Sequence, residues 1–348
     1  MNSQIENKSE KMKRSFIRIG NEKIYKGERK KIQIEVASLF DYTALNIPIE
    51  VIRGKEDGPT LFISAAIHGD EINGVEIIKR ILKRPFLARI KGTLILVPVV
   101  NIFGFNHQSR YLPDRRDLNR CFPGNSKGSL GARLASIFMK EIVNKCTHGI
   151  DLHTGAIHRT NIPQIRACLD DLETKKLAES FGVPVIIHAK LKDGSLREAA
   201  RSRKVSTLLF EGGEALRFEE DIIKAGVKGC ISVMREIGIL PKLKEKNLTN
   251  KKKTFIAKNS YWVRANHSGS FSAKKKIGDH VKTDDLLAII SDPFGCDPYE
   301  VRAGEGGIII GLSTIPLVNK GDAMFHIATF KNSKKVKEAM NFIDSDLI

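Results

Sequence analysis

The strongest constraint on the fold is an alternation of short, continuous apolar runs with amphipathic helical segments. TLFISAAI (60–67) and GTLILVPVVN (92–101) are almost wholly apolar and short. Such runs suit strands that are buried on both faces of a parallel sheet. Residues 73–83, between them, have apolar side chains at helical spacing. This alternation predicts an α/β domain with a mixed, mostly parallel sheet flanked by helices.

The same alternation continues to about residue 240. Further strands are expected at 31–39, 46–54, 148–153, 183–189 and 205–213. Further helices are expected at 129–145, at 170–182, where Gly182 ends the helix, and at 220–239. The predicted helices and strands are therefore numerous enough to bury a sizeable hydrophobic core.

The sequence changes character near residue 246, where KNLTNKKK is a polar, charged linker. Beyond it, 274–290 and 313–327 resemble each other: each has an apolar position, a short polar turn and then a hydrophobic strand. This repetition predicts a small C-terminal all-β domain of two similar halves, like the barrel-sandwich fold. The predicted parts are a disordered basic lead (1–14), an α/β domain (15–245), a linker (246–254) and a β domain with a terminal helix (255–348).

Composition narrows the class of partner. The formal net charge of +18 allows an acidic partner such as nucleic acid or a membrane surface. A soluble basic enzyme is favoured, because no arginine-rich arm, GxGxxG motif or P-loop is present. No apolar run reaches about 18 residues, so no membrane span is expected. The five cysteines are scattered without a CxxC pair, which favours a reducing, cytoplasmic location.

Polar side chains stand where the predicted strands end. His68 ends the first apolar run and Glu71 follows three residues later, while His153 and Glu211 end two later strands. In open α/β sheets, ligands bind at the carboxyl ends of the strands. We therefore expect these side chains to lie at one edge of the sheet. A solvated loop is the alternative for an isolated HxxE, and the combination with two later strand ends favours a site.

Two histidines and one carboxylate form a typical hydrolytic zinc set that leaves the fourth position for water. The sequence predicts one Zn²⁺ per chain, held by His68, Glu71 and His153. Cobalt or manganese is also compatible with these ligand types. Asp151, two residues before His153 on the same strand face, could orient that histidine.

Two further groups suggest how a substrate is handled. Glu211 ends an apolar strand before two glycines and is the candidate general base, with Glu214 a weaker one. A helix cap or a surface glutamate is the alternative. The loop 109–124 is rich in arginine, and its guanidinium groups could hold a substrate carboxylate, with Asn119 adding an amide contact.

Four motifs in order, HGDE (68–71), SRY…DLNR (109–120), DLH (151–153) and FEGG (210–213), carry a family resemblance. Over about residues 45–240 the chain resembles the succinylglutamate desuccinylase/aspartoacylase family, relatives of the zinc carboxypeptidases. The resemblance implies a zinc-carboxypeptidase-like fold, and a C-terminal β domain is also typical of the family. It implies zinc ligands at His68, Glu71 and His153, a base at Glu211 and substrate contacts at Arg110, Asn119 and Arg120.

The implied reaction is hydrolysis of an N-acyl amino acid to a carboxylate and a free amine. The expected partner is thus a small-molecule carboxylate; a membrane is not expected, a nucleic acid is disfavoured, and a homo-oligomer is left open. Two alternatives remain at this point. One is a metallocarboxypeptidase acting on short peptides, and the other is a non-catalytic basic binding protein on the same scaffold.

Overall fold

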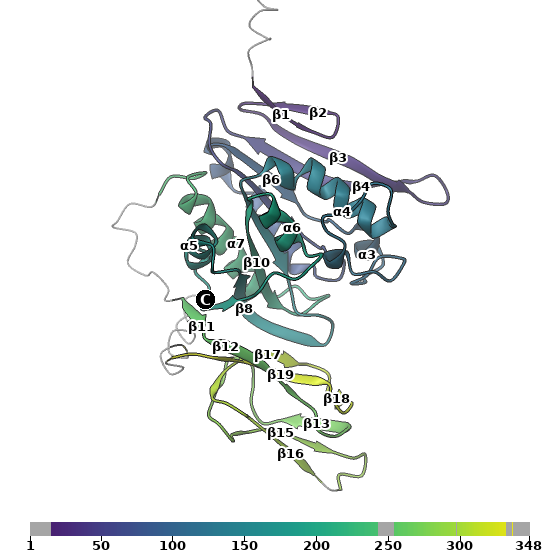
Figure 1. Cartoon of the computed structure of the whole chain (residues 1–348), viewed down its shortest axis with the longest axis vertical. Helices are drawn as coiled ribbons and strands as arrows, with labels where there is room; N and C mark the ends of the chain where they lie inside the picture. Colours follow the sequence, from purple (N-terminus) through teal and green to yellow (C-terminus); the bar gives the residue numbers. More distant parts are fainter. Residues whose placement is uncertain (1–14, 243–253, 297, 332–335, 337–348) are drawn as a thin grey trace, which may run out of the picture.

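The computed structural model describes residues 15–242, 254–296, 298–331 and 336 (Figure 1). The predicted lead, most of the predicted linker and the predicted terminal helix lie outside the described residues. Within the described part, thirteen strands form one sheet, whose main path runs β12-β19-β17-β8-β10-β7-β5-β6-β4-β3. Helices flank this sheet, as the alternation predicts.

Four parallel strands form the centre of the sheet. They are β5 (Thr60–Ala65), β6 (Thr93–Val97), β7 (His148–His153) and β10 (Ser206–Gly213), in the order β10-β7-β5-β6. Every residue of β6 is buried, which explains why this strand reads as a continuous apolar run. Because these strands are parallel, their carboxyl ends meet at one edge of the sheet.

Antiparallel strands flank this centre. β4 (Ala44–Arg53) pairs with β6, and β3 (Arg29–Ser38) pairs with β4. On the other side β8 (Arg159–Ala167) pairs antiparallel with β10. A separate hairpin joins β1 (Phe16–Ile19) and β2 (Glu22–Tyr25). The sequence pattern missed β1, β2 and β8, because their apolar residues neither run continuously nor alternate cleanly.

Helices cover both faces of the sheet and bury two large cores. α2 (Asn73–Leu82), α5 (Leu172–Phe181) and α7 (Glu220–Glu236) contribute apolar residues to one core. α4 (Leu130–Glu141) and α6 (Leu196–Ser202) contribute to the other. In Figure 1, α5 and α7 lie on one side of the sheet and α4 and α6 on the other. Shorter helices are α3 (Ile102–Asn106), η1 (Pro85–Arg89), η2 (Leu118–Arg120) and η3 (Val143–Lys145).

Helix ends follow local sequence signals. The Ser129 hydroxyl accepts a hydrogen bond from the Ala132 amide at the start of α4, and Asp171 caps α5 in the same way at Thr174. α5 ends at Gly182, which has a φ of +79°. Within the described residues, no helix combines the length and apolar composition needed to cross a membrane.

The C-terminal strands gather below the α/β part in Figure 1. A four-stranded antiparallel sheet has the order β16-β15-β13-β18, with β13 (Gly269–Ala273), β15 (Leu286–Ser291), β16 (Tyr299–Arg302) and β18 (Leu317–Val318). The others, β11 (Phe255–Ala257), β12 (Asn259–Arg264), β14 (His280–Val281), β17 (Gly307–Ser313) and β19 (Ala323–Thr329), extend the main sheet. The two similar segments each form a two-residue strand, a turn and a longer strand, as the repetition predicts.

The C-terminal strands join the main sheet at two places: β17 pairs with β8, and β11 pairs in parallel with the strand at Val185–His188. β17 pairs antiparallel with the first residues of β8, so that Gly311 lies opposite Asn161. The last residues of β8 pair with β9 (Val185–His188). β8 therefore connects the α/β part, including β10, to the C-terminal part by backbone hydrogen bonds.

Candidate metal centre

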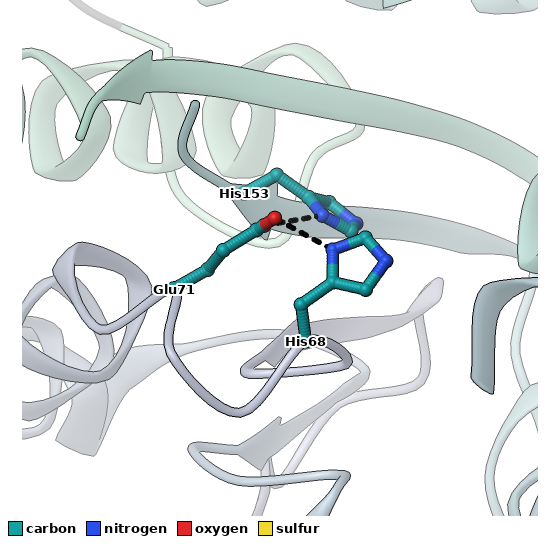
Figure 2. A group of neighbouring side chains, drawn as sticks. All are labelled: His68, Glu71 and His153. Atoms are coloured by element: carbon teal, nitrogen blue, oxygen red, sulfur yellow. Dashed lines mark hydrogen bonds and ion pairs between the residues drawn. The ribbon is translucent and has the colours of Figure 1, made fainter. Parts of the chain in front are cut away.

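His68, Glu71 and His153 come together at the carboxyl edge of the sheet. β5 and β7 are adjacent parallel strands, so the loop after β5 lies beside the last residue of β7. One candidate ligand atom from each residue lies within 4.8 Å of the other two. All three side chains are buried, and Figure 2 shows the two imidazole rings next to each other, both facing the Glu71 carboxylate.

The backbone after β5 is shaped to present two ligands. The Glu71 amide donates to the His68 carbonyl oxygen at 3.1 Å, which closes a tight turn. At Gly69 a Cβ atom would lie 1.9 Å from the backbone carbonyl carbon of Gly104. Only glycine allows this approach between the turn and α3. The HGDE sequence thus places His68 and Glu71 side by side.

Both histidines direct the same nitrogen at Glu71. His68 Nδ1 lies 2.6 Å from Glu71 Oε1, and His153 Nδ1 lies 2.7 Å from Glu71 Oε2. The Thr154 amide also donates to Glu71 Oε2 at 3.1 Å. Both Nδ1 atoms therefore lie beside the same carboxylate, and the three residues are close enough to one another to hold a single cation.

A second carboxylate lies behind each imidazole. His153 Nε2 is 2.7 Å from Asp151 Oδ2, and the Ser64 hydroxyl donates to Asp151 Oδ1 at 2.8 Å. His68 Nε2 is 3.1 Å from Asp117 Oδ1. Carboxylates in this position fix the orientation and tautomer of a ligand histidine. The sequence pointed to Asp151 through its spacing but missed Asp117, although it is the first residue of DLNR.

The electrostatics of the centre favour added positive charge. Burial alone would raise the pKa of Glu71, but the charges of His68 and His153 outweigh it and hold this pKa far below its usual range. Burial opposes protonation of His153, yet Asp151 and Glu71 raise its pKa well above the ordinary value. A divalent cation would supply this positive charge with both histidines neutral, so the donor set fits a metal.

Arg110 reaches the centre from the loop after α3. Its Nη1 donates to Glu71 Oε1 at 3.1 Å, and its Nη2 donates to Asp117 Oδ2 at 3.0 Å. The side chain is about a quarter exposed, at 26%. The guanidinium thus lies at the solvent side of the ligand group.

Asn119 and Arg120 lie in η2 beside the start of α6. Asn119 Oδ1 accepts a hydrogen bond from the Leu196 amide at 2.9 Å, so the side-chain oxygen of Asn119 is bound to the first residue of α6. Arg120 donates from Nη1 to the Asn119 carbonyl oxygen at 2.6 Å. Among the residues that the structure describes, no carboxylate forms an ion pair with Arg120, which leaves its charge for another anion.

Glu211, on β10, lies next to the candidate metal ligand His153. Its Cα is paired with that of His153 on β7, and neighbouring strands are about 4.8 Å apart. Its carboxylate forms an ion pair with Arg166 on β8. The Glu214 carboxylate lies in a different environment, where it accepts a hydrogen bond from the exposed His158 amide at 3.0 Å. No sequence pattern pointed to Arg166, since β8 itself was not recognised.

Comparison with known proteins identifies the family of this chain. The model of the succinylglutamate desuccinylase/aspartoacylase catalytic domain matches residues 57–237, more than half of the chain. The chain belongs to the succinylglutamate desuccinylase/aspartoacylase family. The family match spans all the candidate ligands together with Glu211 and the arginine-rich loop.

Several known proteins are similar to this chain over most of its length. The chain is 27% identical over 300 residues to the N-alpha-acetyl-L-2,4-diaminobutyric acid deacetylase of Halomonas elongata, covering 82% of this chain and 86% of the relative. A succinylglutamate desuccinylase/aspartoacylase from Rhodobacter sphaeroides shares the fold with a TM-score of 0.76 at 23% identity, covering 87% and 96%. The product-bound ectoine utilization protein EutE (DoeB) of Ruegeria pomeroyi gives 0.77 at 24%, covering 87% and 94%.

Proposed function

We propose that this protein is a zinc-dependent hydrolase that removes the acyl group from an N-acyl amino acid, with Glu211 as the general base. The observation that carries the proposal is the convergence of His68, Glu71 and His153 beside Glu211. Family membership supports hydrolysis of an N-acyl amino acid, because a relative is named as a deacetylase of such a compound.

Each residue has a chemical role in this proposal. Zinc held by the three ligands would activate water and polarise the acyl carbonyl group. Glu211 takes the proton from the attacking water and returns it to the leaving nitrogen. Arg110, at the solvent side of Glu71, stabilises the negative charge that develops on the acyl oxygen.

The surroundings favour an anionic substrate. Arg120 lies close to Lys192, whose pKa is lowered by burial and by the charges of Arg120, Arg166 and Arg197. Arg197 is only 8% exposed, and it donates a hydrogen bond to the backbone carbonyl oxygen of Arg166. We propose that Arg120 and the amide nitrogen of Asn119 hold the substrate carboxylate. The same positive charge disfavours a second amine on the substrate, so acidic or neutral N-acyl amino acids are preferred over N-acetyl-diaminobutyrate.

The first experiment combines metal analysis with a substrate panel. Purified protein is expected to bind about one zinc per chain and to hydrolyse N-acyl amino acids faster than short peptides. Faster cleavage of peptides would favour a metallocarboxypeptidase instead. If the protein binds no stoichiometric metal and His68→Ala leaves activity unchanged, the enzyme proposal is wrong.

The second experiment tests the base. Glu211→Gln is expected to keep its metal and to lose turnover by about 10²- to 10⁴-fold, the usual contribution of general acid–base catalysis. Glu214→Gln is the matched control, because Glu214 is close in sequence but hydrogen-bonds to a loop amide. Loss of metal in Glu211→Gln would show that Glu211 acts on the metal site rather than as the base.

A further inference from the structure

The backbone at Glu211 does not by itself fix the carboxylate. The pairing of β10 with β8 changes register between Glu211 and Gly213, which marks a bulge. Gly212 follows directly, and Gly213 has a φ of +76°. Glycines and a bulge leave the end of this strand conformationally permissive. Strand pairing holds the Cα of Glu211 opposite His153 and Gln164 but leaves the side-chain rotamer open, so a side-chain contact is needed to orient the carboxylate.

Arg166 supplies that contact from a firmly held strand. Its Cα is paired with Leu209 of β10 on one side and with Ile187 of β9 on the other. Leu209 is two residues from Glu211, so Arg166 and Glu211 project from the same face of the sheet. Their ion pair runs diagonally between the two strands.

The charges around Arg166 make Glu211 its specific partner. In the part of the chain that the structure describes, Glu211 is the one carboxylate that forms an ion pair with Arg166. Arg197 donates to the Arg166 carbonyl oxygen at 3.4 Å, so a second cation lies close to Arg166. A half-buried guanidinium without a carboxylate would be costly, which favours keeping the pair intact.

The C-terminal strands close this region from the other side. His326 of β19 is buried and stacks on Trp262 with ring centroids 4.4 Å apart. Burial and the charge of Arg166 lower the pKa of His326 to about 3. His326 is therefore neutral at physiological pH and adds no positive charge beside Arg166.

We infer that Arg166 is a positioning residue for catalysis: it holds the Glu211 carboxylate in the orientation from which it accepts a proton. This inference rests on the proposed function, in which Glu211 is the base. Arg166 acts through Glu211, and in the part of the chain that the structure describes it forms no hydrogen bond or ion pair with His68, Glu71 or His153. Removing it should lower the rate of turnover without lowering metal content or substrate affinity.

Kinetics of the zinc-loaded variants test this directly. Arg166→Met is expected to lower kcat by about 10²-fold, the typical effect of a small misplacement of a catalytic group. Its KM should stay within about twofold of wild type, and its metal content should not change. Arg166→Lys keeps the charge and is expected to restore part of kcat. Arg159→Met is the matched control, since Arg159 lies on the same strand but packs over the Trp262 ring at 5.5 Å.

A double variant separates this inference from the proposed function. If Arg166 acts only through Glu211, Arg166→Met adds no further loss to Glu211→Gln. Full activity of Glu211→Gln would overturn the proposed base, and the inference with it. A slow Glu211→Gln with a fully active Arg166→Met would overturn the inference alone. An increase in KM confined to substrates with a charged acyl group would also overturn it, because Arg166 would then be a substrate contact. If Arg166→Met does not fold, the comparison of Arg166→Lys with wild type decides by the same criteria.

Discussion

Replacing Asp151 with asparagine should weaken zinc binding while leaving the three ligands in place. Asp151 is fully buried, and its two oxygens are held by His153 Nε2 at 2.7 Å and by the Ser64 hydroxyl at 2.8 Å. Asparagine has nearly the same shape. The side-chain oxygen of the asparagine can still accept a hydrogen bond from His153 Nε2. Its NH₂ group then faces Ser64, whose hydroxyl oxygen can accept a hydrogen bond.

The magnitude follows from the lost charge. A hydrogen bond to a charged group contributes about 1.5–3 kcal/mol, against about 0.5–1.5 kcal/mol for a neutral pair. The substitution therefore removes about 1–2 kcal/mol of support for a neutral, correctly oriented His153. Mutating a residue that hydrogen-bonds to a ligand histidine typically lowers metal affinity by about 10- to 100-fold. We expect the Kd of Asp151→Asn for zinc to rise within this range.

Competition with a chromophoric chelator of known affinity measures this Kd on metal-free protein at one fixed pH. Ser64→Ala is the control, because it removes the outer hydrogen bond and keeps the carboxylate. Its affinity should fall less than that of Asp151→Asn. Circular dichroism checks that both variants are folded. If folded Asp151→Asn binds zinc as tightly as wild type, the carboxylate behind His153 does not support the ligand.

Two further substitutions probe the fold around the site. The folded state keeps His326 neutral with a pKa of about 3, while the unfolded chain protonates it near pH 6.5, so acid favours unfolding between these values. As the pH is lowered from 6 to 4, the free energy of unfolding of wild type should fall faster than that of His326→Phe, by up to about 1.4 kcal/mol per pH unit. Urea unfolding at several pH values measures both free energies. An equal pH dependence in the two proteins would contradict this prediction. Gly69→Ala places a Cβ 1.9 Å from the Gly104 backbone and should destabilise the protein by about 3 kcal/mol or more in urea unfolding. Gly304→Ala is the control, as a Cβ there meets nothing within 4 Å; equal stability of the two variants would show that the turn after β5 has room.

The sequence predicted the central strands well, for a local physical reason. A strand buried on both faces must be apolar throughout, so β5 and β6 are visible as short continuous runs. The positions of His68 and His153 followed, because parallel strands end at the same edge. The turn that brings Glu71 beside His68 is also local, since it spans only three residues.

The missed elements depend on contacts between distant segments. β8 contains Pro163 and two buried polar residues, Asn161 and Gln164, so it lacks the apolar pattern of a central strand. It is ordered by pairing with β10, β9 and β17, which the sequence does not reveal. Arg166 was missed for the same reason. Asp117 was within a recognised motif, but its contact with His68 spans 49 residues.

The seam between β8 and β17 sets a limit on how this protein can be shortened. A chain cut at residue 242 would lose β17 and leave the backbone donors and acceptors of Arg159 to Asn161 without the partners they now have. Such an open sheet edge invites pairing between molecules, so the shortened protein should aggregate rather than persist as a free hydrolase. The C-terminal strands thus occupy this edge of the sheet and prevent it from pairing with the sheet of another molecule.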